Sequence, residues 1–396
     1  MTYTIEKVTT LIGARRYGDN DTNIGFILTD SRSLCFPEET LFFALKSERN
    51  DGHNYIPELY RRGVKNFVVT NVPKGYASDY PGANFLKVVN TLEALQRLAE
   101  RHRDEFNIPI VGITGSNGKT MVKEWLYQLL SPSMFVTRSP RSYNSQIGVP
   151  LSVWLMNEQT QVGVFEAGIS MPGEMLALRD IIQPTIAVLT NLGAAHQENF
   201  SSMEEKCREK LILFHDAETV IYDGDDEVIN KVIAEYPDYK GEKLFWSLKN
   251  AEAPFYVKNI EKQQSVSVIT YIYKGVEDSF SIPFIDDASV QNAIISAVVA
   301  SKLGLSAEDI DKRMAQLEPV AMRLEVKVGQ HGCTLINDSY NSDINSLDIA
   351  LDFMNRRPDH RGRRHTLILS DIYQSGQAPE VLYKDCLLYT SPSPRD

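Results

Sequence analysis

The sequence predicts an α/β protein with a doubly wound, mostly parallel central sheet, a smaller α/β unit before it and an incomplete Rossmann-like unit after it. Three observations support this prediction. Apolar strand-like runs alternate with helical segments from residue 108 to about 315, a shorter alternation fills residues 1–105, and a third begins near residue 318 and stops after two strand-like runs. Such alternation is typical of parallel sheets with helices on both faces.

Composition limits the function classes. The 396 residues are 43 % hydrophobic, enough for two or three packed domains, and the net charge of −11 argues against a general nucleic-acid-binding protein. The four cysteines are far apart without a CxxC pair, which predicts reduced thiols and no zinc site. The N-terminus has no apolar signal core and no run reaches the roughly 18 apolar residues of a membrane span. We therefore expect a cytoplasmic protein without a membrane span.

The first unit contains two loops rich in groups that recognise polar ligands. Residues 29–32 (Thr-Asp-Ser-Arg) follow a strand, and residues 51–53 (Asp-Gly-His) precede a helix. Taken alone, the Asp-Ser-Arg segment is more often a solvated turn, because Asp and Ser favour turns through local hydrogen bonds. The expected helices of this unit are Ile5–Ile12, Tyr55–Arg62 and Leu92–Phe106, and the expected strands are Gly25–Leu28, Leu41–Leu45 and Asn66–Thr70.

The second unit opens with a predicted phosphate loop. The apolar run Ile108–Ile113 leads through two glycines to Lys119 and Thr120, and a helix is expected over Met121–Leu130. Glycines let backbone N–H groups converge on phosphate oxygens, the lysine reaches the β- and γ-phosphates, and the threonine holds Mg²⁺. The strict pattern requires glycine at position 113, where this chain has isoleucine. A Gly-rich turn that only lets a helix pack on a sheet is therefore the alternative.

Polar residues follow the next predicted strands, Val162–Phe165 and Thr185–Thr190. Glu166 closes the first of these, where a carboxylate can bind Mg²⁺ opposite Thr120; the alternative is a solvated strand end. The second is followed by a polar cluster that ends in His196, for which a ligand role and an ordinary surface or core role are equally weighted.

Lys206 and Lys210 lie four residues apart on the expected helix Met203–Phe214, among glutamates. The default interpretation of such a run is a charged face exposed to solvent.

Further along, residues 243–284 have the pattern of antiparallel strands with Gly275 in a turn. The remaining expected elements are a strand at Thr219–Tyr222 and helices at Ala288–Leu303 and Ser306–Leu317.

The third unit is expected to be truncated. It has a strand at Thr334–Asn337, a helix at Asn345–Met354 and a strand at Thr366–Leu369. About 70 residues fall short of a typical domain, and a parallel sheet of two strands would leave an unpaired edge. The composition then shifts abruptly, and we expect residues 386–396 to be a non-native tail.

Taken together, these motifs resemble those of the Mur ligases, the ATP-dependent amide-forming enzymes of peptidoglycan and cell-wall synthesis. The segment Thr114–Thr120 matches that family's own phosphate loop. In the family's order there follow Asn144 with residues 147–150, Glu166, Asn191 with residues 195–196, Asn292 and Arg323. The resemblance implies three domains and a tail: residues 1–106 for the UDP-substrate, 107–317 for ATP, a truncated 318–385, and 386–396.

The resemblance also implies roles for individual residues. Lys210 aligns with the family's carbamoylated lysine, with Lys206 one turn away as its rival. The implied catalytic residues are Lys119, His196, Lys210 and Arg323; the metal ligands are Thr120, Glu166, His196 and Lys210, holding Mg²⁺; the ATP-binding residues are Gly115, Ser116, Asn117, Gly118, Lys119, Thr120, Asn292, Arg323 and Asp338; and the substrate-binding residues are Asp30, Ser31, Arg32, Asp51, His53, Asn144, Tyr340 and Asn341.

Within the family, residues 338–341 (Asp-Ser-Tyr-Asn) resemble the signature of the member that adds D-alanyl-D-alanine to UDP-N-acetylmuramoyl-tripeptide through an acyl phosphate. Residues 288–289 (Ala-Ser) depart from the usual His-Asn pair ahead of Asn292, as in the form of the enzyme that is followed by an alanine racemase. Such a racemase domain is an expected partner in the full-length protein. Two alternatives stay open: a sister ligase that adds the third amino acid, and a truncated nucleotide-binding module without turnover.

Overall fold

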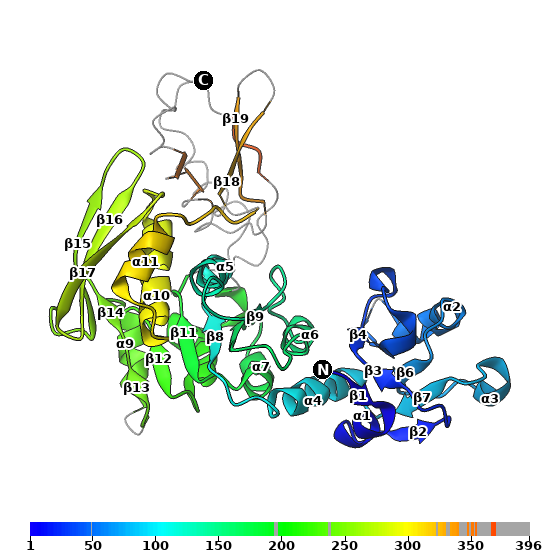
Figure 1. Ribbon diagram of the computed structural model, residues 1–396. Coiled ribbons are helices and arrows are strands. Elements are labelled where there is room, and N and C mark those ends of the chain that lie inside the picture. Colours follow the sequence, from blue (N-terminus) through cyan, green and yellow to red (C-terminus); the bar gives the residue numbers. More distant parts are fainter. Residues whose placement is uncertain are drawn as a thin grey trace.

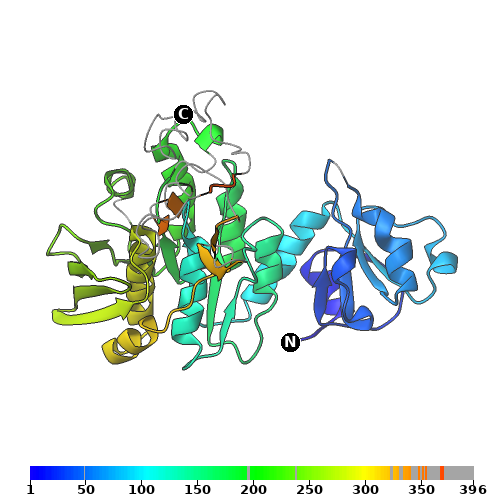
Figure 2. The same ribbon diagram turned by 90° about the horizontal axis from the view of Figure 1, so that it is seen from above.

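The computed structural model describes residues 1–48, 50–193, 197–236, 239–321, 324–329 and 333–339, with 347, 350–351, 353–354 and 366–369. Figure 1 shows an N-terminal unit in blue, a central body in cyan to yellow and a short orange segment beside that body. In both Figure 1 and Figure 2 the N-terminal unit projects from the central body and is joined to it through helix α4 (Thr91–Arg103).

The N-terminal unit is built on a five-stranded sheet of order β2-β7-β6-β5-β4. Its inner strands pair in parallel and are almost fully buried, as expected for a parallel sheet covered on both faces. The strands are β2 (Arg15–Tyr17), β4 (Phe26–Leu28), β5 (Thr40–Phe43), β6 (Asn66–Val69) and β7 (Asn84–Lys87), beside a small sheet of β1 (Tyr3–Thr4) and β3 (Asn23–Ile24); the helices are α1 (Ile5–Leu11), α2 (Ile56–Arg61) and α3 (Tyr76–Asp79).

The central sheet confirms the predicted doubly wound arrangement. Its order is β13-β12-β11-β8-β10-β9, and every pair of neighbours is parallel. Strands β9 and β10 lie on one side of β8 and strands β11 to β13 lie on the other, so the strand order reverses next to β8. Parallel sheets bind ligands at such a point, at the carboxyl ends of the strands. The strands are β8 (Ile110–Thr114), β9 (Val136–Arg138), β10 (Val162–Glu166), β11 (Ile186–Leu189), β12 (Thr219–Ile221) and β13 (Glu242–Lys243).

Two hydrophobic cores lie on the two faces of this sheet. Val111 and Ile113 of β8 face one core, whereas Ile110 faces the other, as the alternation of side chains along a strand requires. Helices α5 (Lys119–Leu130), α10 (Asp287–Lys302) and α11 (Ala307–Met314) contribute to the first core. The second core is formed by α6 (Gly148–Val153), α7 (Glu174–Ile182), α8 (Met203–Leu211) and α9 (Glu227–Ile233). No helix among the described residues is long and apolar enough to cross a bilayer.

A second sheet packs on the first core beyond α10 and α11. Strands β15, β16 and β17 are antiparallel, as predicted, and Lys274 and Gly275 turn the last hairpin with positive φ angles of 51° and 78°. The parallel pairing of the short β14 with β15 was not predicted. The bounds are β14 (Trp246–Ser247), β15 (Phe255–Lys262), β16 (Ser267–Tyr273) and β17 (Val276–Ile282).

The third unit is represented by an antiparallel hairpin of β18 (Glu325–Val328) and β19 (Thr334–Asn337). The strand predicted at Thr334–Asn337 is confirmed, and the one predicted at Thr366–Leu369 is wrong, because these residues form no strand and Ile368 is 88 % exposed. An apolar run becomes a strand only where a neighbouring strand completes its hydrogen bonds, and no described strand does so here. Most of the predicted helix Asn345–Met354 and all of residues 386–396 lie outside the described residues.

A buried histidine joins the N-terminal unit to the central body. His102 of α4 lies between Tyr3, whose hydroxyl is 2.8 Å from Nδ1, and the Met156 carbonyl, 3.0 Å from Nε2. The carbonyl can only accept, so Nε2 carries the proton and Nδ1 accepts from the tyrosine. Trp154 packs against the ring and donates to the Gly25 carbonyl at 3.0 Å. The neutral histidine thus holds the junction together.

This junction predicts a loss of stability in mild acid. Burial lowers the pKa of His102 from 6.5 to about 4, so the unfolded chain binds a proton more readily than the folded one. The neutral histidine therefore contributes fully to the free energy of unfolding above pH 6.5, and this contribution is lost as the pH falls toward 4. The total loss is at most about 3 kcal/mol. Urea unfolding at neutral and acidic pH should show a smaller acid loss for His102→Gln than for the wild type. An equal acid loss in both proteins would contradict the assignment to His102.

Candidate active site

The predicted phosphate loop joins β8 to α5, and its two glycines are required by its shape. Gly115 and Gly118 have φ angles of +143° and +81°, a region that side chains rarely allow. A Cβ atom on Gly115 would lie 1.9 Å from Oγ1 of Thr190, and one on Gly118 would lie 2.3 Å from Oδ1 of Asn292. The loop is therefore packed between the end of β11 and the predicted adenine-binding residue Asn292 on α10.

The segment after β11 holds this loop in place. The backbone N–H groups of Ser116 and Asn117 donate to the carbonyl and side-chain oxygens of Asn191 at 3.0 and 2.9 Å. The Thr190 hydroxyl donates to the Asn117 carbonyl at 2.5 Å. In contrast, no side chain caps the start of α5, because its N-cap residue is Gly118. The first N–H groups of this 12-residue helix thus remain directed at the loop, which is the arrangement that binds phosphate.

Lys119 folds back over the loop. Its ammonium donates to the carbonyl oxygens of Gly115 at 2.6 Å and Ser116 at 3.1 Å. The side chain therefore lies over the backbone that would surround a phosphate, as the loop motif predicts.

Thr120 and Glu166 meet at the carboxyl ends of two adjacent strands. The Thr120 hydroxyl donates to Oε2 of Glu166 at 3.0 Å, and the glutamate is completely buried. Ser142 also contacts the Thr120 hydroxyl, at 3.1 Å. The alternative interpretation of Glu166 as a solvated strand end is therefore wrong. A buried carboxylate is retained where it meets a cation, a hydrogen-bond donor or a metal.

The donors around Thr120 fit a magnesium ion. Oε2 of Glu166 receives the Thr120 hydroxyl and Oε1 lies 3.1 Å from the Lys123 ammonium, and the buried carboxylate keeps further lone pairs for a metal ion. Hydroxyl and carboxylate oxygens are the ligands that Mg²⁺ prefers, with water and phosphate oxygens completing its shell. No group of three or more His, Cys, Asp and Glu side chains among the described residues could hold a metal without such additional ligands.

The solvent-face interpretation of the α8 lysines is wrong. Lys206 and Lys210 are both buried; Lys210 reaches the phosphate loop, and Lys206 reaches the segment after β11. Lys206 donates to the Gly193 carbonyl at 2.5 Å and Lys210 to the Gly115 carbonyl at 3.2 Å. Burial, and then the charges of Lys119 and Lys206, hold the pKa of Lys210 well below its usual range. The four-residue spacing correctly predicted that the two lysines share one helix face, but it did not predict that this face is buried.

Two other predicted site residues, Asn144 and Asp338, are described by the structure. Asn144 packs on the continuation of β10: its carbonyl accepts from the Gly168 N–H at 2.8 Å, and a Cβ on Gly168 would lie 2.8 Å from its Cγ. Asp338 follows β19 and accepts from the Leu324 N–H at 3.2 Å. His196, Arg323, Tyr340 and Asn341 lie outside the described residues.

The two N-terminal loops form local caps in the N-terminal unit, beyond α4 from the central sheet (Figure 1). Asp30 accepts from the Arg32 N–H and side chain, which lower the pKa of this carboxyl to about 2, and Ser31 begins the 3₁₀ turn that Asp30 caps. Asp51 caps the turn Gly52–Tyr55, and His53 Nε2 accepts from the Thr70 N–H at 3.0 Å. The structure therefore does not bring these residues to the phosphate loop.

One residue of this site was missed from the sequence. Lys123 of α5 is completely buried, and its ammonium lies 3.1 Å from Oε1 of Glu166. A signal existed, because Lys123 is three residues before Leu126 and seven before Leu130 and so falls on the apolar face of the helix.

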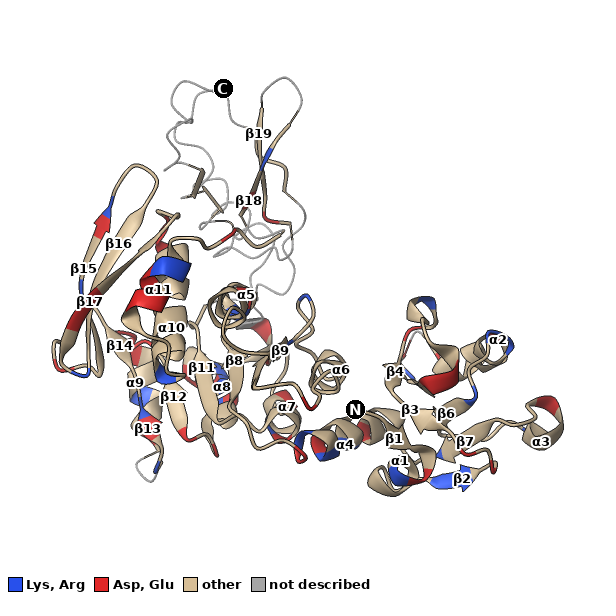
Figure 3. Cartoon of the chain, in the orientation of Figure 1, with Lys and Arg blue, Asp and Glu red and all other residues tan. Residues whose placement is uncertain are grey.

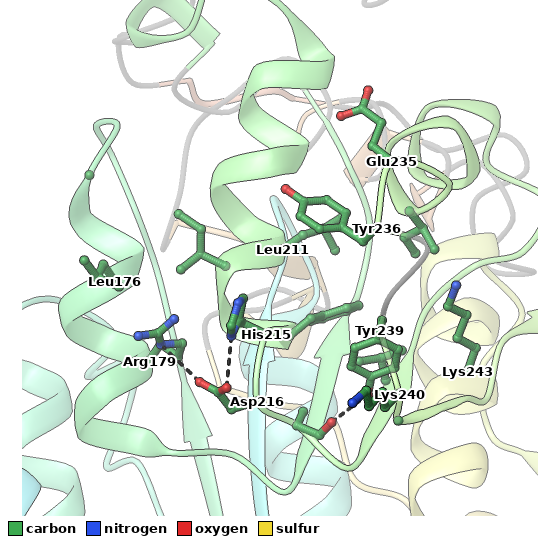
Figure 4. A pocket seen from close by; sticks show the side chains of 17 residues that line it. Leu176, Arg179, Leu211, His215, Asp216, Glu235, Tyr236, Tyr239, Lys240 and Lys243 are labelled. Carbon is green, nitrogen blue, oxygen red and sulfur yellow. Dashed lines mark hydrogen bonds and ion pairs between the residues drawn. The ribbon is translucent and has the colours of Figure 1, made fainter.

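A cavity of about 790 Å³ lies elsewhere in the central body. Figure 4 shows its lining from α7, the end of α8 and the segment around Tyr239, with Arg179 and His215 among the labelled side chains. It reaches Ala217, just before β12, and thus lies at the amino ends of the strands, opposite the phosphate loop. None of the loop residues line it, and it is separate from the candidate site.

The fold and the site together define a phosphate-loop α/β protein. The chain matches the model of the Mur ligase middle domain over residues 113–300. Over 382 residues it is 29 % identical to the UDP-N-acetylmuramoyl-tripeptide--D-alanyl-D-alanine ligase of Bacillus subtilis, covering 95 % of this chain and 79 % of the relative. The Escherichia coli enzyme of the same name is 25 % identical, covering 96 % and 81 %.

Solved structures share the fold. A crystal structure of MurF from Acinetobacter baumannii superposes with a TM-score of 0.87 at 23 % identity, covering 100 % of this chain and 85 % of that one. MurF ligase from Thermotoga maritima in complex with ADP gives a TM-score of 0.72 at 24 % identity, covering 88 % and 76 %. The predicted α/β fold with a parallel central sheet is confirmed.

Proposed function

We propose that this chain is an ATP-dependent ligase that joins D-alanyl-D-alanine to UDP-N-acetylmuramoyl-tripeptide in peptidoglycan precursor synthesis. The observation that carries this proposal is the buried Thr120–Glu166 pair beside the uncapped start of α5, in a chain similar over 95 % of its length to a ligase of that name. Because ATP is the co-substrate, we place the reaction in the cytoplasm.

The parts of the chain divide the work. We assign UDP-substrate binding to residues 1–106, ATP binding to 107–317 and closure over the nucleotide to 318–385, with residues 386–396 as a tail without a role. In the first part the substrate contacts are Asp30, Ser31, Arg32, Asp51 and His53; Asn144, Tyr340 and Asn341 contribute from the other parts; and Arg323 and Asp338 meet the nucleotide.

The reaction proceeds in two balanced steps. A carboxylate oxygen of the tripeptide attacks the γ-phosphorus of ATP, the bond to ADP breaks, and an acyl phosphate forms. The amine of D-alanyl-D-alanine then attacks the acyl carbon, and as the amide forms the nitrogen loses a proton and inorganic phosphate leaves. Lys119 and the first N–H groups of α5 stabilise charge on the transferred phosphoryl group because they are fixed before the reaction begins.

Magnesium would be held by Thr120 and Glu166, with His196 and a carbamoylated Lys210 as further ligands. When bound, it supplies neutralising charge at the phosphate oxygens. Asn292, which contacts Gly118, is placed to meet the base of the nucleotide beyond the loop.

Phosphate release tests this function. The purified chain, and a version extended to complete the third unit, would be given ATP, Mg²⁺ and UDP-N-acetylmuramoyl-tripeptide, with and without D-alanyl-D-alanine. We expect release that requires the dipeptide, with a pentapeptide product by mass. Release with a single amino acid and a shorter UDP-peptide would instead identify a sister ligase. ATP binding without release from either version would identify a nucleotide-binding module.

A further inference from the structure

Lys123 is the most completely enclosed cation beside the candidate site. Its side chain is fully buried on α5, one turn after Lys119. The ammonium lies 3.1 Å from Oε1 of Glu166 and 2.9 Å from Oε1 of Glu124. It also donates to the carbonyls of Ser139, at 2.9 Å, and Arg141. One charged group therefore contacts the proposed metal ligand and the segment 139–141 at the same time.

Segment 139–142 contacts the proposed magnesium ligands. Ser142 is 3.1 Å from the Thr120 hydroxyl, and the Ser139 hydroxyl accepts from the Glu166 N–H at 3.2 Å. Arg141 has a φ of +49°, in the left-handed region that residues other than glycine seldom adopt. Because Lys123 holds the Arg141 carbonyl, it stabilises this unusual turn of the backbone. The same ammonium thus positions both neighbours of Thr120.

A structural role alone does not account for a lysine at this position. Replacing a buried ion pair with well-packed apolar residues is often neutral or stabilising. The neighbours of Lys123 on its helix face, such as Leu126 and Leu130, are apolar and buried. The charge balance also points to Glu166, because Glu124 has a second cation, Arg138, 3.0 Å away.

We propose that Lys123 is a positioning residue for the nucleotide-bound magnesium: its ammonium fixes Glu166 so that Oε2 faces Thr120, and ties segment 139–142 to the same carboxylate. This inference rests on the proposed function, because it assumes that ATP and Mg²⁺ bind at this loop. In this proposal Lys123 acts through Glu166: its ammonium is at Oε1 of the carboxylate, whereas the Thr120 hydroxyl is at Oε2.

The test compares nucleotide affinity with and without magnesium. ADP binding to the full chain would be measured by calorimetry in excess Mg²⁺ and in EDTA, for wild type, Lys123→Met and Lys123→Gln. We expect both variants to bind ADP in EDTA like the wild type, because Lys119 and the loop are intact. In excess Mg²⁺ the wild type should bind ADP more tightly than in EDTA, and this increase in affinity should be at least tenfold smaller in both variants. Lys123→Gln keeps N–H donors for the two carbonyls, so it provides a folded variant if Lys123→Met does not fold.

Two controls make the outcome specific. Lys258→Met removes an exposed lysine paired with Glu277 on the second sheet and should leave the Mg²⁺-dependent gain unchanged. Lys123→Arg keeps the charge and should recover part of the gain. An unchanged or larger gain in folded Lys123→Met or Lys123→Gln would overturn the proposal, as would equal losses with and without Mg²⁺. If the wild type itself binds no ADP, the proposed function fails instead.

Discussion

Replacing Lys119 with alanine is expected to abolish ATP turnover while leaving binding of the UDP-substrate largely intact. The ammonium of Lys119 lies over the loop, 2.6 Å from the Gly115 carbonyl, where it would stabilise charge on the transferred phosphoryl group. Loss of one such fixed group typically lowers the rate roughly 10²- to 10³-fold, and a lysine that also binds the ground state should cost at least that. The proposed UDP-substrate loops are in the separate N-terminal unit (Figure 2) and should not change.

Two measurements on one variant check this result. Phosphate release reports turnover, and calorimetry with the UDP-substrate reports binding to residues 1–106. Lys65→Ala, a change of a lysine in the N-terminal unit that stacks on Tyr60, is a matched control and should retain turnover. Equal loss of turnover and substrate binding in folded Lys119→Ala would show that the assignment of these roles to separate units is wrong.

The phosphate loop and its flanking elements could be predicted because their signals are local. Gly115 and Gly118 serve a backbone shape that few other residues permit, and the strand before them is a continuous apolar run. The position of Glu166 followed from the rule that parallel strands end at one edge of a sheet. These predictions needed no knowledge of which strand lies beside which.

The remaining features depend on contacts between distant segments. Lys206 and Lys210 have the spacing of a solvated helix face, and only the packing of α8 beside β11 and the loop buries them. The charge of Lys123 is balanced by Glu166, 43 positions along the chain, so its helix alone suggested no role. At residues 366–369 the opposite occurs: the sequence favours a strand, but no described strand pairs with it.

The net charge of the chain did not help to predict its ligand, because acidic and basic residues are mixed on its surface. Figure 3 shows acidic and basic residues on the same helices, for example on α11, so the net charge of −11 is not concentrated there in one sign. Such mixed faces are typical of soluble α/β proteins and neither identify nor exclude an anionic substrate. Near the phosphate loop, the charges that the structure makes informative are the buried ones of Lys123, Glu166 and Lys210.

Replacing Lys210 is expected to remove both turnover and a bound carbamate. Lys210 is buried, donates to the Gly115 carbonyl at 3.2 Å, and has the charges of Lys119 and Lys206 close enough to lower its pKa. A neutral amine there can add to CO₂, forming a carbamate and releasing a proton. The product is an anion beside two cations, which relieves the repulsion among three lysines and provides oxygens for a metal. We expect Lys210→Arg to lower turnover roughly 10²-fold or more, because arginine stays cationic and cannot form the carbamate.

Carbon-13 NMR with labelled bicarbonate measures the carbamate directly. The wild type should show a carbamate carbonyl signal that is absent from Lys210→Arg and present in Lys206→Arg. The two lysines are matched, since both are buried on α8 and both donate to a backbone carbonyl near the loop. They differ in where they point, because Lys210 reaches Gly115 in the phosphate loop and Lys206 reaches Gly193 after β11. A signal that disappears with Lys206→Arg and persists in Lys210→Arg would transfer the metal-ligand role to Lys206.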